Sequence, residues 1–195
     1  MHPFTKSDLD QLRLDLTLRA KNGLNFILAA TLLWLLITYI WTLPISMSGR
    51  NVYTLWATGL MFPLAIGFSK LIKSSWSMPD NPLQPLGIWL NVAQLGYFPI
   101  LAFMYVKHPQ YFIMTYAVIT GAHFLPYAWF YNTPAFLVMG LIVAIGATYL
   151  GFVLPTYQTY YIPFFTGVCM MVLATWLYVD YRRKLAVSTS LSPVN

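Results

Sequence analysis

Polar side chains recur along one face of a single apolar segment. Their spacing is i, i+4, i+7 and i+11, which places all of them on one stripe of an α-helix. The four residues are Tyr116, Thr120, His123 and Tyr127. They lie within residues 108–179, a stretch that contains no Asp, Glu, Lys or Arg. Hydrocarbon disfavours such a face, so we expect it to turn toward protein or a water-filled cavity.

Two amide side chains extend this polar face to a neighbouring segment. Asn91 and Gln94 are three residues apart and therefore share one face of a helix. At a rise of about 1.5 Å per residue, both lie at a depth similar to that of His123 when the two segments are antiparallel neighbours. We therefore predict a hydrogen-bonded cluster of Asn91, Gln94 and His123, with Tyr127 and Thr120 at its rim. Such a cluster either binds a ligand or only joins two helices.

His123 decides what chemistry this polar layer can support. Its side chain titrates near neutral pH, so its protonation can gate a ligand site, yet it can also stay neutral in a structural role. The ligand-binding prediction covers six residues in all. They are His123, Asn91, Gln94, Tyr127, Thr120 and Tyr116.

Other kinds of site find no support in the sequence. The chain has no Glu, and its five Asp lie outside the apolar segments or at their edges, which leaves no paired carboxylates for acid–base catalysis. His2, His108 and His123 are far apart, and no His or Cys pair has metal-ligand spacing. We therefore predict no catalytic residue, no metal and no cofactor. An enzyme acting on a lipid is the weakest of the functions considered.

The composition indicates what kind of protein carries these residues. Of its 195 residues, 58% are hydrophobic and only 8% are charged, and the mean hydropathy is +0.63. These values are typical of a polytopic membrane protein rather than of a soluble domain. The net charge of +6 comes from basic residues in short clusters beside the apolar segments. Such clusters indicate topology signals and contacts with anionic lipid headgroups, and we predict no binding of nucleic acid.

The chain divides into an N-terminal segment, a membrane domain and a tail. Residues 7–22 are expected to form an amphipathic helix at the membrane interface, with Ser7 and Asp10 as a capping pair. The apolar runs that follow predict an all-α fold with six transmembrane helices. Their expected ranges are 24–43, 52–69, 86–106, 110–131, 135–154 and 160–179. The predicted domains are residues 1–23, 24–180 and 181–195, and the tail after Lys184 is expected to be disordered.

The distribution of Lys and Arg predicts the orientation. With six crossings, nine of the eleven basic side chains fall on the side of the termini, and only Arg50 and Lys107 on the other. Basic segments stay in the cytoplasm, so both termini are predicted to be cytoplasmic, in the plasma or inner membrane of a cell. The lipid bilayer is the first expected partner, and the sequence leaves the oligomeric state open.

Two functions of different classes fit this pattern. The first is a small transporter, channel or ligand-binding protein for a neutral, weakly polar or lipid-like small molecule, held by the layer around His123. It is supported by an uncharged, aromatic core with prolines that permit broken helices. These prolines are Pro63, Pro99, Pro126 and Pro163. The alternative is a non-catalytic accessory or structural protein, in which Gly121, Gly140 and Gly146 serve packing, including against other membrane proteins.

Overall fold

The computed structural model of the protein describes residues 5–191, and within that range it contains helices and no β-strand. Five helices in this range are long and apolar enough to cross a membrane. They are Lys6–Thr42, Met47–Ile72, Gln84–Lys107, Pro134–Val153 and Thr156–Ser190. The all-α prediction is confirmed, and these apolar helices are those of a multi-pass membrane protein. The other predicted span, 110–131, is interrupted and does not form one long helix.

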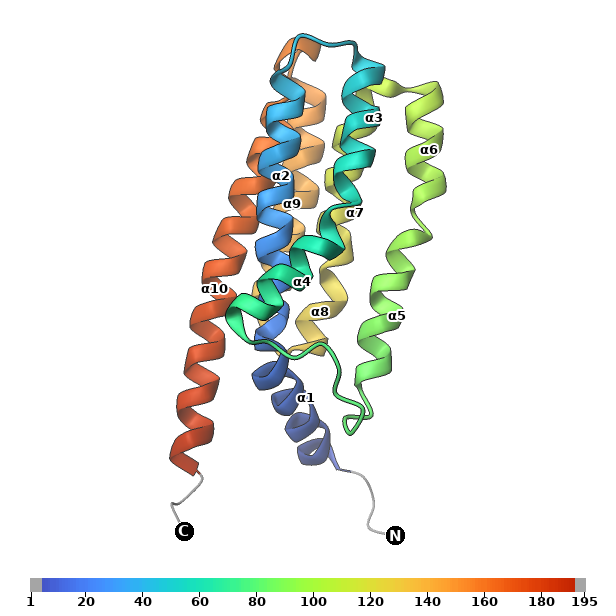
Figure 1. Cartoon of the computed structure of the whole chain (residues 1–195). Coiled ribbons are helices and arrows are strands. Elements are labelled where there is room, and N and C mark those ends of the chain that lie inside the picture. The colour runs from blue at the N-terminus through green and yellow to red at the C-terminus, as the bar shows by residue number, and fades with distance from the viewer. Residues whose placement is uncertain (1–4, 192–195) are drawn as a thin grey trace.

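The helices lie roughly side by side in one elongated bundle (Figure 1). Those of the first part of the chain are α1 (Lys6–Ala20), η1 (Lys21–Gly23), α2 (Leu24–Thr42), α3 (Met47–Thr58) and α4 (Met61–Ile72). The second part contains α5 (Gln84–Leu95), α6 (Phe98–Lys107), η2 (Pro109–Tyr111), α7 (Phe112–His123), α8 (Leu125–Phe130), α9 (Pro134–Val153), η3 (Thr156–Gln158) and α10 (Tyr161–Leu191).

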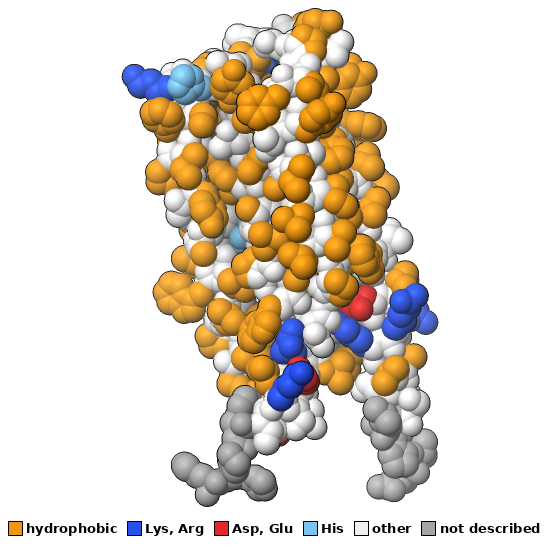
Figure 2. Space-filling model, turned by 180° about the vertical axis from the view of Figure 1, so that it is seen from behind, with side chains coloured by type: hydrophobic (Ala, Val, Ile, Leu, Met, Phe, Trp, Pro, Cys, Tyr) orange, Lys and Arg blue, Asp and Glu red, His pale blue; other side chains and the backbone are white. Residues whose placement is uncertain are grey.

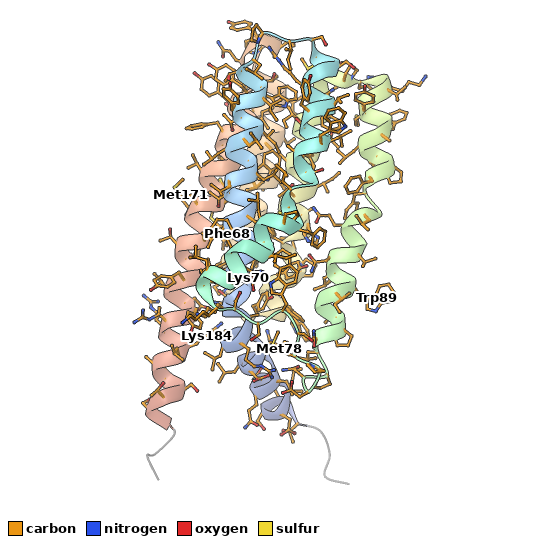
Figure 3. All side chains as sticks on the ribbon, in the orientation of Figure 1. Phe68, Lys70, Met78, Trp89, Met171 and Lys184 are labelled. Carbon is orange, nitrogen blue, oxygen red and sulfur yellow. The ribbon has the colours of Figure 1, made fainter. Side chains whose placement is uncertain are left out.

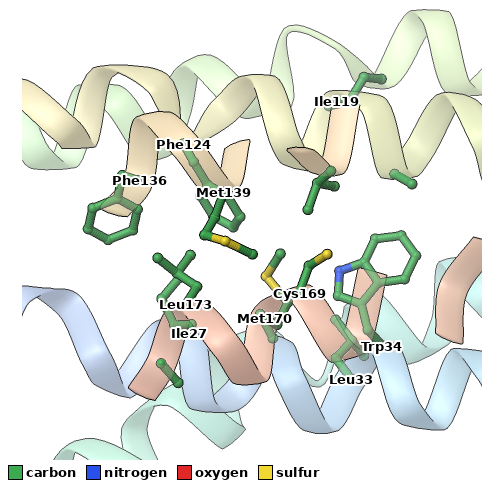
Figure 4. Close-up of a cluster of buried hydrophobic side chains, with 14 of the residues drawn as sticks. Ile27, Leu33, Trp34, Ile119, Phe124, Phe136, Met139, Cys169, Met170 and Leu173 are labelled. Carbon is green, nitrogen blue, oxygen red and sulfur yellow. The ribbon is translucent and has the colours of Figure 1, made fainter. Parts of the chain in front are cut away.

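Three long, uninterrupted helices, α2, α9 and α10, form the closely packed part of the bundle. α2 packs along α10, and α9 packs against α10 and α7. Ile37 on α2, Val143 on α9 and Leu173 on α10 are completely buried. Figure 4 shows the centre of this core, where Trp34 of α2 lies near Met170 of α10. Between membrane helices, such close contacts stabilise the fold mainly by van der Waals packing.

Glycines allow α7 and α9 to approach each other closely. A Cβ atom added at Gly121 would lie 2.6 Å from the carbonyl oxygen of Gly140, and the reverse distance is also 2.6 Å. Neither position accommodates a side chain without movement of the backbone. At Gly146 of α9, an added Cβ would lie 2.4 Å from the ring of Phe165 on α10. The space beside each of these three glycines is therefore occupied by atoms of the same chain.

The remaining spans are interrupted near prolines. α3 gives way to α4 just before Pro63, α5 to α6 just before Pro99, and α7 to α8 just before Pro126. Proline has no N–H and its ring crowds the carbonyl group four residues earlier, so each helix stops and restarts through a tight turn. Pro163 differs because it lies in the first turn of α10, where that hydrogen bond is not needed, and α10 continues unbroken.

The α5–α6 segment is loosely packed against the rest of the bundle. α5 has no buried residue, and Leu101 is the buried residue of α6. Figure 1 shows this segment at the side of the bundle, away from α9 and α10. Trp89 points outward from α5 (Figure 3) and is 68% exposed. A large apolar side chain in this position is suited to contact with lipid.

The N-terminal helix has a different cap from the predicted one. The backbone N–H of Thr5 donates to the Asp8 carboxylate at 2.7 Å, and the N–H of Asp8 donates to Thr5 Oγ1 at 3.3 Å. The predicted pair of Ser7 and Asp10 is therefore wrong, because the chain is already helical from Lys6 onward. A helix is present at Lys6–Ala20, whereas its amphipathic character and its position at a membrane interface stay predictions.

Side chains from both ends of the chain cap the end of α8. The guanidinium group of Arg13, on α1, donates to the carbonyl oxygen of Trp129. Thr17 Oγ1 donates to the carbonyl oxygen of Tyr131 at 2.9 Å. Lys184 Nζ, on α10, donates to the same carbonyl oxygen at 2.9 Å. Carbonyl groups at the end of a helix have no partner within the helix, so these donors stabilise the short α8.

α10 continues to Leu191, so the disorder predicted after Lys184 is wrong for residues 185–191. Near its end, the Asp180 carboxylate pairs with Lys184 at 2.8 Å and accepts a hydrogen bond from Asn22 Nδ2 at 2.9 Å. The hydrogen bond from Asn22 joins α10 to the turn between α1 and α2. α1 begins and α10 ends at the same end of the bundle (Figure 1), and Figure 2 shows Lys, Arg and acidic side chains gathered near that end.

Gly140→Ala tests the packing of α7 on α9. The added methyl group overlaps the backbone of α7, so the free energy of unfolding is expected to fall by about 1–3 kcal/mol. Gly67→Ala is the matched control, because no atom lies within 4 Å of a Cβ added there. The control is expected to be neutral or slightly stabilising. Thermal unfolding in detergent measures both, and equal stability of Gly140→Ala and wild type would contradict the described packing.

Candidate functional site

A cavity of about 440 Å³ lies between α2 and the interrupted helices. Residues of α1, η1, α2, α3, α4, α5, α6, α7, α8 and α9 contribute to its wall, as does the loop between α4 and α5. Along α2 the lining runs from Asn25 to Trp34, a length of about 14 Å at 1.5 Å per residue. The cavity is thus elongated, and its volume lies in the range of small-molecule binding sites.

All six residues predicted to bind a ligand line this cavity. Asn91 and Gln94 come from α5, Tyr116, Thr120 and His123 from α7, and Tyr127 from α8. Their helical spacing puts each group on one face, and the fold turns the faces of α5 and α7 toward the same space. The structure therefore brings the six residues together, and ligand binding by them stays a prediction.

Each of the three helix interruptions contributes to the wall of the cavity. Thr58 and Met61 flank the interruption between α3 and α4, and Leu95 and Phe98 flank the one between α5 and α6. His123 is the last residue of α7, at the third interruption. Irregular backbone at membrane depth is tolerated where it is buried in protein or lines a cavity. The interruptions and the cavity are therefore parts of one arrangement.

The predicted hydrogen-bond cluster does not form. Asn91 Nδ2 donates at 2.9 Å to a backbone carbonyl one turn earlier in its own helix, and Thr120 Oγ1 does the same, also at 2.9 Å. Among the described residues, the side chains of Gln94 and His123 have no hydrogen-bond partner. The prediction failed because the facing helices are separated by the cavity instead of packing directly on each other.

The hydroxyl group of Tyr127 is buried and has no hydrogen-bond partner within residues 5–191. Its ring stands edge-on to His123, with 5.2 Å between the ring centroids, and contacts Phe136 at 5.7 Å. A buried donor without a partner costs about 1–3 kcal/mol. Tyr127, His123 and Gln94 therefore offer unused hydrogen-bonding groups at the cavity, which a bound molecule would satisfy.

The lining of the cavity contains no Asp, Glu, Lys or Arg. Most of its surface is aliphatic or aromatic, for example where the rings of Trp34 and Tyr116 lie 5.1 Å apart. A charged ligand would lose its hydration here without gaining an ionic partner, which costs several kcal/mol or more. The site is thus suited to a neutral molecule held by a few hydrogen bonds and a large apolar contact.

The loop between α4 and α5 also lines the cavity, a role that the sequence does not predict. Met78 of this loop is buried and lines the cavity; Figure 3 shows it near α1. The guanidinium group of Arg19 on α1 makes two hydrogen bonds to the Asp80 carboxylate, at 2.7 and 3.0 Å. Asn81 Nδ2 donates to Asp15 at 2.9 Å. The sequence signals a turn here, but no local pattern indicates its contact with α1.

Comparison with protein-family models places the chain in a family. The model of a family described as a family of unknown function (DUF7010) matches residues 9–180. Neither the curated proteins nor the solved structures include a match to the chain. The matched range extends from α1 to α10 and includes every residue that lines the cavity.

Tyr127→Phe is expected to stabilise the ligand-free protein. The change removes a buried hydroxyl group that has no partner and keeps the ring contacts, so the free energy of unfolding is expected to rise by about 1 kcal/mol. Tyr149→Phe serves as the control, because Tyr149 is 64% exposed and its replacement is expected to have little effect. Thermal unfolding of the two variants gives the comparison. Destabilisation by Tyr127→Phe would show that the hydroxyl group has a partner.

The contact between Arg19 and Asp80 predicts a pH dependence of stability. Hydrogen bonds from Arg19 hold the pKa of the Asp80 carboxyl group below its ordinary value of 3.8. Since the folded-state pKa is the lower one, the contact stabilises the fold above pH 3.8 and is lost as the pH falls through the lowered pKa. Asp80→Asn is therefore expected to be less stable than wild type near neutral pH, and this difference is expected to shrink at low pH, as the pH falls through the lowered pKa of Asp80.

Thermal unfolding of wild type and Asp80→Asn at both pH values measures this difference. Arg19→Gln and the double variant complete a double-mutant cycle, which separates the Asp80 contact from the contact of Arg19 with Asp15. A difference between wild type and Asp80→Asn that persists unchanged at low pH would rule out the ion pair as its source.

Proposed function

The chain belongs to DUF7010, a family of unknown function, and from its cavity we propose that it is a membrane protein that binds a neutral small molecule. The polar layer around His123 would hold the polar part of this molecule, and the aromatic wall its apolar part. We further propose that the protein moves this molecule, as a small transporter does. The observation that carries the proposal is the meeting of three interrupted helices at one uncharged cavity.

The unused hydrogen-bonding groups support binding. Tyr127 leaves a buried hydroxyl group without a partner, and Gln94 and His123 have no partner among the described residues. In a site that only joins helices, such groups would bond to each other across the helix interface. Their separation by a cavity instead fits a site that is completed by a ligand.

The contrast between continuous and interrupted helices supports movement. In many transporters, discontinuous helices form the substrate site and one group of helices moves against another. Here α2, α9 and α10 form a continuous, closely packed group, whereas α5 and α6 make few buried contacts. A change of angle at the turn before Pro99 would alter the cavity without disturbing the packed group.

The proposal includes six membrane crossings, of which α7 and α8 together make the interrupted fourth. An even number is supported by the start of α1 and the end of α10 at the same end of the bundle (Figure 1). The gathering of basic side chains near that end supports its placement in the cytoplasm, with the protein in the plasma or inner membrane (Figure 2). Lys70 and Lys73 are exposed and would contact anionic lipid headgroups there.

The alternative, an accessory protein that packs against other membrane proteins, has less support. Its main argument was a set of small residues available for contact with a partner. Gly121 and Gly140 instead contact each other, and Gly146 lies against Phe165. In a purely structural protein, the unused hydrogen-bonding groups of Tyr127, Gln94 and His123 would also have no role.

A ligand panel tests the proposal. The purified protein in lipid nanodiscs is screened by thermal unfolding against uncharged small molecules and charged analogues of similar size. An uncharged molecule is expected to raise the unfolding temperature, and its charged analogue is not. For such a molecule, His123→Ala is expected to weaken binding by roughly tenfold, because one hydrogen bond is lost in a buried site.

His108→Ala is the matched control, because His108 is exposed and does not line the cavity. It is expected to bind the same molecule with unchanged affinity. Proteoliposome flux of that molecule then separates a transporter from a binding protein. The absence of any stabilising molecule together with the absence of flux would overturn the proposal and favour the accessory role.

A further inference from the structure

We infer that the ligand reaches the cavity sideways from the lipid bilayer, through the gap between α4 and α5, and is therefore a membrane-dissolved molecule with a hydrogen-bond acceptor. This inference rests on the proposed function and adds to it the route of entry and the chemical class of the substrate. It excludes a polar solute that enters from the aqueous phase.

The side of the cavity between α4 and α5 is open. Phe62 on α4 and Ile88 and Leu95 on α5 line the cavity, yet they are 59%, 57% and 59% exposed. A lining residue with more than half of its surface exposed belongs to the mouth of a cavity and not to its interior. These mouth residues are apolar and belong to helices of the apolar spans, so the mouth faces lipid.

The end of the cavity near the termini is covered by the loop between α4 and α5. Met78 of this loop lines the cavity and is 4% exposed, whereas Trp76, which also lines it, is 40% exposed, less than Phe62, Ile88 or Leu95. This loop is fastened to α1 by the paired hydrogen bonds from Arg19 to Asp80 and by those from Asn81 to α1. The backbone N–H of Ser75 also donates to the carbonyl oxygen of Arg19 at 2.9 Å. Entry from the water on this side would require all these bonds to break.

The opposite end of the cavity is closed by aromatic packing. Trp34 and Tyr116 lie together there, and Phe112, which is completely buried, contacts Tyr116 with 6.4 Å between the ring centroids. Beyond them, Trp41 Nε1 donates to Thr54 Oγ1 at 3.0 Å and holds α2 against α3. The side toward lipid thus carries the most exposed apolar residues of the cavity lining.

The groups inside the cavity define what such a molecule must carry. The hydroxyl group of Tyr127 and the amide of Gln94 are donors without acceptors, so a carbonyl or ether oxygen in the ligand would satisfy them. Because the lining is otherwise mostly apolar, the rest of the molecule would be a hydrocarbon or ring system. A medium-chain ketone represents this chemical class.

Cysteine accessibility tests the route without the need for a known ligand. The native Cys169 is first replaced by alanine, and Ala30→Cys then places a thiol on the cavity wall of α2. Two methanethiosulfonates with the same reactive group are compared in nanodiscs: a hexyl reagent that dissolves in the bilayer, and a trimethylammonium-ethyl reagent that does not. The labelling rate of the hexyl reagent is divided by its rate at a reference site, Leu32→Cys. The labelling rate of the charged reagent is divided by its rate at Ser77→Cys.

The normalised rate at Ala30→Cys is expected to be at least about tenfold higher for the hexyl reagent. Ala29→Cys is the matched control, because Ala29 is completely buried and does not line the cavity, and it is expected to react with neither reagent. Ile27→Cys provides a second position on the cavity wall if Ala30→Cys does not fold. Equal normalised rates, a faster charged reagent, or no reaction with either reagent would overturn the inferred route.

Binding of a molecule that carries a hydrogen-bond acceptor is measured separately. The stabilising effect of 2-undecanone is compared with that of undecane. The ketone is expected to stabilise the wild-type protein, and the hydrocarbon and Tyr127→Phe are expected to show a much smaller effect. If the hexyl reagent labels Ala30→Cys but the ketone does not bind, only the inference that the ligand carries a hydrogen-bond acceptor is contradicted. If a molecule of the ligand panel binds to the protein but the charged reagent labels Ala30→Cys, the inferred route is contradicted and the proposed function stands.

Discussion

Backbone hydrogen bonding in an apolar surrounding is the constraint on which the rest of this structure depends. In hydrocarbon, an unpaired N–H or carbonyl group costs several kcal/mol, so a chain of this composition is driven into helices. Pro63, Pro99 and Pro126 remove three of the required donors from the middle of apolar segments. The fold accommodates them by turning each interruption toward a shared cavity.

The interrupted helices need support from elsewhere in the chain. Glycine contacts hold α7 against the unbroken α9, with Gly121 and Gly140 at the closest approach. The short α8 receives hydrogen bonds at its end from Arg13 and Thr17 of α1 and from Lys184 of α10. The two ends of the chain thereby hold the helix that carries Tyr127, and the cavity is built on one side by a firmly packed group.

The sequence predicts the all-α fold class, and the six residues predicted to bind a ligand line one cavity. Apolar segments predicted the helices, and the four-residue stripe on α7 and α8 lies in the cavity as its spacing required. The hydrogen-bond cluster could not be predicted correctly, because spacing shows which face a side chain occupies but not how far apart two faces lie. Asn91 therefore bonds within its own helix instead of reaching His123.

The sequence also does not predict which distant segments contact each other. The pairing of Arg19 with Asp80 depends on the path of a loop whose proline-rich sequence indicates only a turn. The cap of α1 shows a local limit: two overlapping sequence patterns, at Thr5 and at Ser7, both fit a helix start. Prolines, similarly, predict interruptions only where a complete turn of helix precedes them, which explains the difference between Pro126 and Pro163.

We propose that the cavity holds an uncharged molecule. Native mass spectrometry of the protein released from nanodiscs measures this directly, with Ala30→Phe as a variant whose ring fills the cavity. A bound uncharged species is expected on the wild-type protein and is expected to be absent from the folded variant. A wild-type protein without any bound species, or the same species on both proteins, would contradict the claim.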